Sequence, residues 1–591
     1  MEFSPVTVAE WRAQVEKELA GKPFDAALVH EAMEGILVAP LYTEGPRATL
    51  ATLAPRERRG VPFRICMRHE PGAAADDSAG DADLKAGADL KADADLKADV
   101  EGGADALWLG LERALTRDDL ARRFHVIDMD EASSAEDLES AVGRLAPVAT
   151  SGFALTLDPL ARRARGSAPF MTLAEDLTTL GRVARAVEEH AQGATAAMVS
   201  TLPYHEAGAD AADEIAFALS TGARYLDALL SSGLSPDQAA RQIAVQVSVG
   251  RDTFLELCKL RALRTCWQKL LAALAAVDTR RAGPAEATLI HAVCSSRTLT
   301  ARDPWVNMLR VTTQVFSAVL GGADLVTPSA FDQALGAPSA LGRRVARNTG
   351  LVLREESFLG RVIDPAGGAY YFETLTDALA REAWRRFRAI EREGGITAAL
   401  ESGRISAKLD AAWHDWLARI AKRKAPILGV SEFANLDETL PRPAPRDEAP
   451  QASPGALAAH RDATIFEALR ARAEAAGTPP EALLVTLGPF AESRARVGFA
   501  TGFLGAGGIR TRESTADEGV PLACLCGSDE RYAAEAVDRA RALKAAGCRR
   551  VLVAGRPGRL EAPLREAGVD GFIFIGCDVV AVLSELLEVP S

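Results

Sequence analysis

The middle of the chain alternates between short apolar runs and longer segments with helical periodicity, and this alternation limits the possible folds more than any other feature. Between about residues 104 and 435 the strand-like runs are ALWLGL, FHVIDM, FALTL, AAMVS, ATLIHAV and DLVTP, and the helical segments include SAEDLESAVGRLA, ADEIAFALSTGARYLDALLSSG and RDTFLELCKLRALRTCWQKLLAAL. Such alternation predicts parallel strands joined by crossover helices. We expect a (β/α)8 TIM barrel over residues 46–435, with an open doubly wound sheet as the alternative.

A second, smaller unit follows at residues 481–591. Its apolar runs ALLVTLG, PLACLCG, RRVLVAG and GFIFIG are nearly continuous, which is typical of a parallel sheet covered on both faces. This pattern predicts a flavodoxin-like doubly wound domain. Between the two units, LPRPAPRDEAPQASPG at 440–455 contains five prolines and predicts an extended linker, placed within residues 436–480.

The first 45 residues contain an amphipathic helix, AEWRAQVEKELAG, which ends at Gly21 and is followed by the extended GILVAPLYTE. The apolar face of the helix consists of Trp11, Val15 and Leu19. This pattern fits an N-terminal arm that contacts another subunit, and it fits an ordinary first helix equally well.

A low-complexity tract at residues 72–103 contains the repeats ADLKAG, ADLKAD and ADLKA between residues 82 and 98. The period of six does not match a helical repeat over many turns, and the tract has few apolar side chains. We therefore predict an expanded surface loop without chemical function.

Charge and composition exclude several classes of function. The chain has 81 acidic and 68 basic residues, a net charge of -13, which argues against binding to nucleic acid or to anionic membranes. No stretch of about twenty apolar residues occurs, and no basic segment followed by an apolar run opens the chain, so we predict a cytoplasmic protein. The eight cysteines form no C-x-x-C pair, and we predict neither a disulfide framework nor a metal site.

Two long stretches resemble the methylmalonyl-CoA mutase family. WRAQVEKELAGKPFDAALVHEAMEGILVAPLYTE is similar to the family's N-terminal W-x-x-x-x-E-K-E-L-x-G-K and E-G-I-x-V-x-P-L-Y-T motifs, and residues 299–376, from LTARDPWVNMLR to YYFETLT, resemble the block near the end of its barrel. The resemblance implies interconversion of succinyl-CoA and methylmalonyl-CoA by radicals that arise from adenosylcobalamin. It also implies that this cofactor lies between the barrel and the C-terminal domain.

The family binds cobalamin through a D-x-H-x-x-G motif, in which the imidazole is a ligand of cobalt, the carboxylate fixes that imidazole, and the glycine leaves room for the nucleotide tail. When Gly488 and Gly502 are aligned with the family pattern, the three motif positions are occupied by Phe490, Glu492 and Ala495. None of these three side chains performs the required role.

No other residue of the C-terminal domain replaces this motif. The last of the eight histidines is His460, in the predicted linker, and the family's Gly-Gly pair appears as Ala554-Gly555. The family's Ser-rich loop reads CGSDERY. We expect this chain to bind no cobalamin.

The resemblance also indicates losses in the barrel. Pro62-Phe63 leads into RICMRHEPGAAADD, without the tyrosine of the family's R-P-W-T-x-R-x-Y-A-G. The family's G-Y-H-M-Q-E-A-G-A appears as PYHEAGA, which retains Tyr204 and His205 but lacks two residues before Glu206.

Other substrate and cofactor positions of the barrel are changed as well. The substrate arginine of L-R-T-H-S-Q-T falls at Leu289 or Ile290, and only His291 is retained; Gly350 stands in place of a glutamine and Ala366 in place of the tryptophan of D-P-W-G. Glu373 matches the cofactor-side glutamate, but it lies in a strand-like AYYFETL, where a structural or solvated role is favoured.

Three hypotheses follow. HAVCSSRTLTARDPWVNMLR and HRDATIFEAL resemble the family's small subunit, so the first hypothesis is a non-catalytic small subunit whose large-subunit partner holds adenosylcobalamin. The second is an independent homodimeric acyl-CoA mutase or isomerase, for which Tyr204 and His205 are the sole acid–base candidates. The third is a mutase-associated regulatory module, for which the G-x-x-x-x-G-K-[ST] signature of a GTPase is missing.

Overall fold

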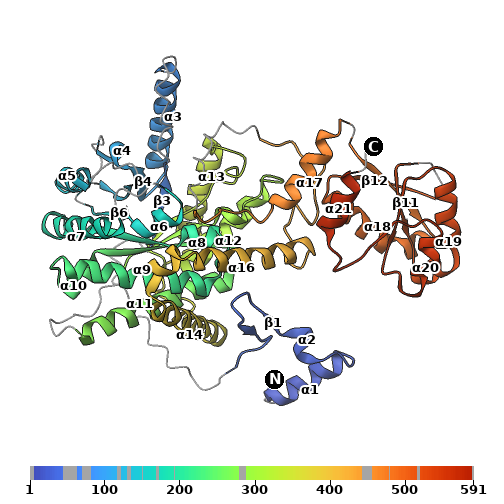
Figure 1. Cartoon of the computed structure of the whole chain (residues 1–591), viewed down its shortest axis with the longest axis horizontal. Helices are drawn as coiled ribbons and strands as arrows, with labels where there is room; N and C mark the ends of the chain where they lie inside the picture. The colour runs from blue at the N-terminus through green and yellow to red at the C-terminus, as the bar shows by residue number, and fades with distance from the viewer. Residues whose placement is uncertain are drawn as a thin grey trace.

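The structure is a computed structural model of the whole chain (Figure 1). The residues that it describes are 6–43, 63–69, 82–115, 122–129, 135–149, 151–167, 172–191, 193–277, 288–441, 455–477, 479–515 and 520–588. Most of the proline-rich segment 440–455 lies outside these ranges, and so do residues 72–81 of the predicted loop.

Eight parallel strands form a closed barrel in which the last strand pairs with the first. In chain order they are β3 Arg64–Arg68, β4 Ala106–Gly110, β5 Phe124–Asp128, β6 Phe153–Leu157, β7 Thr195–Ser200, β8 Ile243–Val249, β9 Ile290–Cys294 and β10 Leu325–Thr327. The prediction of a TIM barrel is confirmed, and the open sheet is excluded. The strand-like runs had omitted β3, which begins and ends with arginine, and β8, which Gln246 and Ser248 interrupt.

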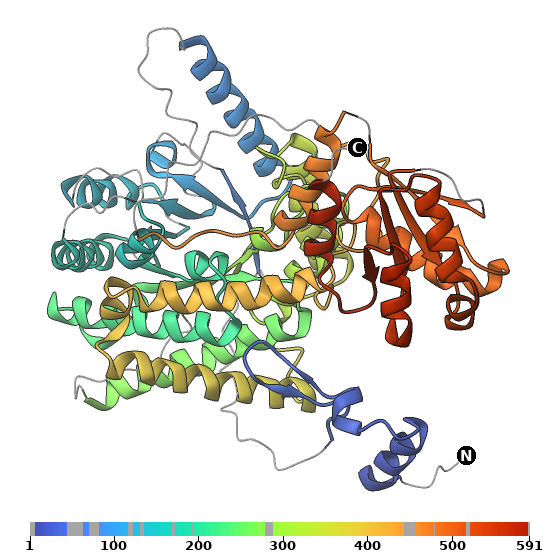
Figure 2. The same cartoon turned by 45° about the vertical axis from the view of Figure 1, so that its right-hand side comes forward.

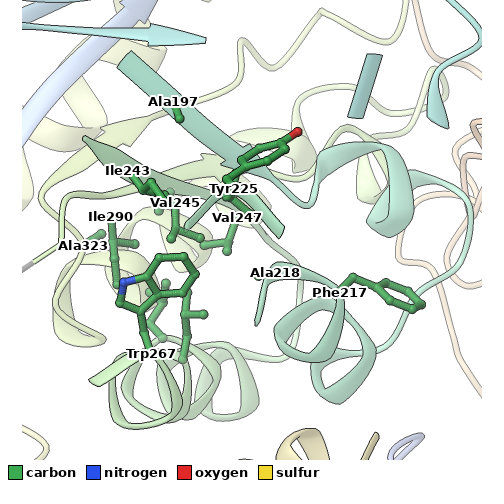
Figure 3. Close-up of a cluster of buried hydrophobic side chains, with 14 of the residues drawn as sticks. Ala197, Phe217, Ala218, Tyr225, Ile243, Val245, Val247, Trp267, Ile290 and Ala323 are labelled. Carbon is green, nitrogen blue, oxygen red and sulfur yellow. The ribbon is translucent and has the colours of Figure 1, made fainter. Parts of the chain in front are cut away.

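Helices surround the barrel and separate its strands. They are α4 Leu111–Leu115, α5 Ala135–Leu145, α6 Pro159–Ala164, α7 Leu173–His190, α8 Leu202–Glu206, α9 Ala211–Ser231, α10 Pro236–Arg241, α11 Thr253–Val277, α12 Val306–Leu320, α13 Ala340–Leu351, α14 Tyr370–Arg392, α15 Gly395–Glu401 and α16 Arg404–Ala421. The cluster in Figure 3 lies between the strands and helices α9 and α11, with Trp267 facing Val245 and Ile290. Gly222 permits this packing, because a Cβ at that position would lie 2.4 Å from the indole.

Residues 82–101 form helix α3 (Ala82–Glu101), so the prediction of a loop over 72–103 is wrong for this part. A period of six does prevent the leucines from lining one face, but alanine, leucine and lysine have high intrinsic helix propensities. The helix projects from the barrel in both views (Figures 1 and 2).

The C-terminal end of α3 is anchored in the barrel, which a solvated loop would not be. Leu96 is buried, and the Asp99 carboxylate accepts hydrogen bonds from the guanidinium groups of Arg343 and Arg347 on α13. This buried ion cluster gives the last repeat tertiary contacts that its composition did not indicate.

The N-terminal segment forms α1 Val8–Glu18, α2 Phe24–Leu28 and a hairpin of β1 His30–Glu31 and β2 Leu37–Val38. No residue of α1 is buried, and both helices lie apart from the barrel helices in Figures 1 and 2. The hairpin makes the contact with the barrel, through buried Glu34, whose Oε1 accepts a hydrogen bond from the Ala211 amide. The segment thus contacts the barrel through its hairpin, and its role as an arm that contacts another subunit stays a prediction.

The C-terminal unit contains a five-stranded parallel sheet whose strands follow the order β12-β11-β13-β14-β15. Counted from its first strand this order is 2-1-3-4-5, the order of flavodoxin-like sheets. The strands are β11 Glu481–Thr486, β12 Arg510–Ser514, β13 Leu522–Cys526, β14 Arg550–Ala554 and β15 Gly571–Ile573. The apolar runs did not indicate β12, which is a polar edge strand.

Helices cover both faces of this sheet. On one face are α17 Thr464–Ala475, α18 Phe490–Gly505 and α21 Val579–Glu588; on the other are α19 Asp529–Ala545 and α20 Glu561–Glu566. Helix α17 lies within the segment predicted as a linker, 436–480, and its residues Phe466 and Leu469 belong to the C-terminal core. The amphipathic TIFEALRARAEA therefore packs with the sheet, and the connection to the barrel is correspondingly shorter.

Within the part of the chain that the structure describes, none of the helices is both long enough and apolar enough to cross a membrane.

Candidate functional site

A hydrogen-bonded chain of side chains crosses the interior of the barrel. Ser200 Oγ donates to Gln246 Oε1 (2.8 Å), Gln246 Nε2 is 3.0 Å from His291 Nδ1, and His291 Nε2 is 2.7 Å from Thr327 Oγ1. Because the Gln246 amide can only donate through Nε2, His291 accepts at Nδ1 and donates from Nε2 to Thr327. Both nitrogens of the ring are thereby used within the protein.

The barrel interior around this chain is filled. Trp108 packs edge-on against His291 with ring centroids 5.4 Å apart, and the Arg68 guanidinium lies 4.3 Å from the Trp108 ring. Burial and the nearby Arg68 lower the pKa of His291 to about 3, so the imidazole is neutral at physiological pH. Cys66, Phe124 and Met198 belong to the same buried cluster as Trp108.

The changed family positions of the barrel are occupied by packing residues. Leu289 packs into the interior cluster, whereas Ile290 faces the surrounding helices, so Leu289 holds the interior position of this pair. A Cβ on Gly350 would lie 2.8 Å from Ile65 Cγ1, and a glutamine there would displace α13 from β3. Ala366 is buried in the same apolar core.

Tyr204 and His205 lie on α8, directly after β7, and both are 2% exposed. His205 Nδ1 is 2.9 Å from Glu214 Oε1 and its Nε2 is 2.7 Å from Ser295 Oγ. The adjoining Glu206 accepts a hydrogen bond from Ser296 Oγ (2.9 Å). The structure brings the two predicted residues together, but it encloses them in the protein.

Glu214 is the centre of a buried ion network. Lys259 Nζ contacts Glu214 Oε1 at 2.8 Å and Glu256 Oε2 at 2.6 Å, and Thr201 Oγ1 donates to Glu214 Oε2 at 2.6 Å. Burial alone would raise the pKa of Glu214, but Lys259 and His205 together lower it to about 2. Burial and the charge of Arg297 lower the pKa of His205. These groups satisfy one another, which is typical of a structural network.

Glu373 lies in the first turn of helix α14 (Tyr370–Arg392), so the strand predicted around it is wrong; the 3.6-residue spacing of Leu375 and Leu379 continues through the helix. Its Oε1 contacts Arg261 Nη2 at 2.9 Å and accepts from the Gly368 amide at 2.8 Å. Glu373 therefore fixes the loop before α14, which fits the structural role that the sequence favoured.

In the C-terminal unit, Phe490, Glu492 and Ala495 occupy the exposed first turns of α18. The Phe490 side chain is 64% exposed, and Glu492 Oε2 accepts from Arg531 Nε at 2.8 Å. Arg531 belongs to α19, which follows β13. The three positions thus lie at the carboxyl ends of β11 and β13, where the strand order reverses and where open α/β sheets bind ligands.

Side chains of the protein itself occupy this crevice. Arg496 Nη1 donates to Ala554 O at 2.8 Å and would lie 2.2 Å from a Cβ on Gly555. The buried Tyr532 hydroxyl lies 3.1 Å from Leu525 O and 2.8 Å from Ala554 O, and so bridges the ends of β13 and β14. Ala554-Gly555 therefore packs against Arg496 and Tyr532.

Comparison with known proteins identifies the family. The family model described as methylmalonyl-CoA mutase matches residues 151–488. The chain is 39% identical to the methylmalonyl-CoA mutase small subunit of Streptomyces virginiae over 99% of this chain and 97% of that protein. It is 37% identical to that of Propionibacterium freudenreichii subsp. shermanii, over 78% and 73% respectively, and 28% identical to the methylmalonyl-CoA mutase of Escherichia coli, over 72% and 64%.

The chain belongs to the methylmalonyl-CoA mutase family. As a member of this family it carries the barrel and a second α/β unit, but its C-terminal crevice does not fit cobalamin. No imidazole is available there, because the sequence has no histidine after His460. The space beside Gly555, which a cofactor tail would need, is taken by the Arg496 guanidinium. Among the described residues, no group of three or more His, Cys, Asp or Glu side chains is arranged to hold a metal ion.

Several residues that define these two regions had not been predicted from the sequence. Glu214 and Lys259 stand beside apolar side chains in DEIAFALS and LELCKLRAL, and this proximity to apolar runs was the available signal of a buried pair. Arg496 and Arg531 gave no such signal, because arginines on polar helices are usually solvated.

Proposed function

We propose that this chain is the non-catalytic subunit of a heterodimeric methylmalonyl-CoA mutase. In this proposal a large subunit binds adenosylcobalamin and interconverts succinyl-CoA and methylmalonyl-CoA, and the present chain binds no cobalamin. The observation that carries the proposal is the C-terminal crevice, in which Arg496 and the Glu492–Arg531 pair take the place of the cofactor-binding groups.

The barrel supports the same proposal. A thioester substrate needs an open path and polar groups that are free to contact it, whereas the chain from Ser200 to Thr327 uses its donors and acceptors internally. Trp108 and Met198 fill the space around that chain. An independent enzyme that used Tyr204 and His205 would need them accessible to a substrate, and both are enclosed.

The N-terminal arm supports a role in assembly. Its helix α1 contains no buried residue, and the Trp11 ring packs against Phe24 of the arm itself, with ring centroids 6.0 Å apart. Leu37 and Leu41 expose 67% and 40% of their surface. An ordered segment with exposed apolar side chains suits a surface of the partner subunit. The relatives from Streptomyces virginiae and Propionibacterium freudenreichii are named small subunits, which also supports a large-subunit partner.

The first test is equilibrium binding of adenosylcobalamin to the purified chain alone, followed by the visible spectrum of the cofactor retained after gel filtration. We expect no retention. Stoichiometric retention would overturn the proposal and favour an independent enzyme. A family large subunit serves as the positive control in the same experiment.

The second test is assembly. Mixing the chain with a family large subunit should produce a one-to-one complex on gel filtration, and deletion of residues 1–29 should weaken that complex without changing the barrel's melting temperature. If the chain instead forms a homodimer that binds an acyl-CoA, the non-catalytic assignment is wrong.

A further inference from the structure

Three arginines converge on the barrel at the carboxyl ends of β8 and β9. Arg251 follows β8, Arg297 lies in the short 3-10 turn Ser296–Thr298 after β9, and Arg310 lies on α12. Helix α16 contacts this group, since the Arg251 guanidinium lies 4.9 Å from the Trp416 ring, and on the barrel side Arg297 Nη1 donates to His205 O at 2.7 Å.

This cluster has more positive than negative charge. Asp462 is the carboxylate at its centre; it accepts a hydrogen bond from Trp416 Nε1 at 2.9 Å and lies 3.7 Å from Arg297 Nε. Neither Arg251 nor Arg310 has a carboxylate within 4 Å among the described residues. Among carboxylates in contact, the three guanidinium groups therefore face a single one, that of Asp462.

Other nearby acids do not compensate this excess by contact. Asp252 and Asp303 also act on the arginines, but neither forms an ion pair with them. Burial, together with the positive charge of Arg297, lowers the pKa of Arg251, while burial and Arg251 lower the pKa of Arg310 to about 10. Buried charges are normally paired, because an unpaired one loses hydration without recovering it from a partner.

The two uncompensated arginines are oriented by backbone carbonyls. Arg251 Nη1 donates to Pro426 O at 3.1 Å, and Arg310 Nη2 donates to Leu428 O at 2.7 Å, two residues further along the same segment. Both of these contacts lie at the solvent edge of the cluster. Arg310 Nη1 also donates to Asn307 Oδ1 at 2.8 Å. The fork of each guanidinium is therefore held in place before any ligand arrives.

We propose that Arg251, Arg297 and Arg310 form an oxyanion-binding site for a phosphate group, at the junction of the barrel and the segment that leads into the C-terminal unit. A phosphate carries up to two negative charges near neutral pH, and planar guanidinium forks bind phosphate oxygens through paired N–H donors. The remaining N–H groups of Arg251 have no acceptor in the described residues and supply these donors. Through the bond from Arg297 Nη1 to His205 O, the site adjoins the segment that carries the retained Tyr204 and His205.

The test is isothermal titration of the full-length chain with inorganic phosphate at constant ionic strength and pH. We expect saturable binding at one site. Arg251→Gln should weaken it by about tenfold or more, because a hydrogen bond between charged groups contributes that much to affinity. The Arg251→Lys variant keeps the charge but lacks the guanidinium fork. Its affinity for phosphate should lie between that of the unmodified chain and that of Arg251→Gln.

Arg224→Gln is the matched control, because Arg224 is on α9 and pairs with Asp227 at 2.7 Å, away from the cluster. It should bind phosphate like the unmodified chain, and circular dichroism melts should establish that all variants fold. Absence of saturable binding by the unmodified chain, or an equal loss in Arg224→Gln and Arg251→Gln, would overturn the site.

A second titration with ADP identifies the source of the phosphate group. If ADP binds more tightly than phosphate and competes with it, the occupant is the phosphate of a larger ligand; if phosphate binds and ADP does not, the occupant is the free anion. In both cases Arg251→Gln must lose the binding, and retention of ADP binding by this variant would contradict the assignment.

Discussion

The barrel interior and the C-terminal crevice both carry changed family positions, yet they are filled in different ways. In the barrel, buried polar groups satisfy one another through the network around Glu214 and the chain that includes His291. In the crevice, exposed side chains such as Glu492 and Arg531 pair at the surface, where water could replace either partner. Loss of a pairing partner costs more stability in a buried site than in an exposed one, because water does not replace the partner there.

The variant with the largest expected effect on the free energy of unfolding is Lys259→Met. The variant leaves Glu214 and Glu256 buried without their common ammonium partner, and breaking a buried pair in this way costs about 3–5 kcal/mol. Urea unfolding, followed by circular dichroism, measures the loss. The matched control is Arg531→Gln, which breaks the exposed pair with Glu492 and should change the midpoint little. Equal shifts in the two variants would refute the distinction between the two regions.

The next largest effect is the pH dependence of the unfolding free energy that arises from His291 in the barrel. The pKa of His291 falls from its ordinary 6.5 to about 3 in the folded chain, through burial and the nearby Arg68. The stability that depends on the neutral ring is therefore present above pH 6.5 and is lost as the pH falls toward 3, by about 1.4 kcal/mol per pH unit. His291→Asn removes this titration. Its unfolding free energy should fall less steeply than that of the unmodified chain between pH 6.5 and 5, and identical slopes would contradict the expectation.

The docking of the N-terminal arm should show a smaller pH dependence of the opposite sign, because it weakens as the pH rises. Burial and the neighbouring Asp210 raise the pKa of Glu34 from 4.5 to about 7, and Glu34 Oε2 is buried without a partner among the described residues. Docking of the hairpin is therefore strongest below pH 4.5, weakens as the pH rises to 7, and is constant above that, with a slope of about 1.4 kcal/mol per pH unit.

Hydrogen exchange measures this docking. The ratio of amide protection in residues 30–42 between Glu34→Gln and the unmodified chain cancels the intrinsic pH dependence of exchange. Because glutamine stays neutral, the ratio should grow from pH 5 to 7 and then level off. A ratio that does not vary with pH would exclude Glu34 as the titrating group, and Glu31→Gln, whose side chain is exposed, serves as the control.

The sequence predicted the architecture well because periodicity reports directly on burial. The alternation of strands and helices indicated the barrel, and the continuous apolar runs indicated the covered parallel sheet. Prediction from the sequence failed where tertiary contacts decide the local structure. Helix α3 is fixed by Asp99, which binds Arg343 and Arg347, 244 and 248 residues further along the chain. No local pattern reports on such a contact.

The site was predictable in one respect only. Motif comparison located the changed positions, such as Leu289, Gly350 and Ala495, since these depend on residue identity. What now occupies those positions was not predictable, because Arg496 reaches Ala554 across 58 residues and Lys259 reaches Glu214 across 45. Both are side-chain contacts between elements whose packing the sequence does not specify.

The smallest expected effect comes from restoring the motif itself. The triple variant Phe490→Asp, Glu492→His and Ala495→Gly supplies the residue types of D-x-H-x-x-G, but Arg496 remains beside Gly555 and occupies the space that the cofactor tail needs. We expect no retention of adenosylcobalamin in the visible spectrum, and no turnover of methylmalonyl-CoA without a large subunit, because Leu289 and the filled barrel interior are unchanged.

Adding Arg496→Gly to the triple variant sharpens the comparison between the two regions. If the filled crevice alone prevents binding, the quadruple variant should retain cofactor, and we expect it to remain inactive because Trp108 and Met198 still pack in the barrel interior. Retention by the triple variant would mean that Arg496 moves aside readily and that residue identity at the motif is the whole barrier. Turnover by either variant on its own would show that the barrel admits substrate despite Trp108 and Met198, and would remove the basis for treating it as a closed structural core.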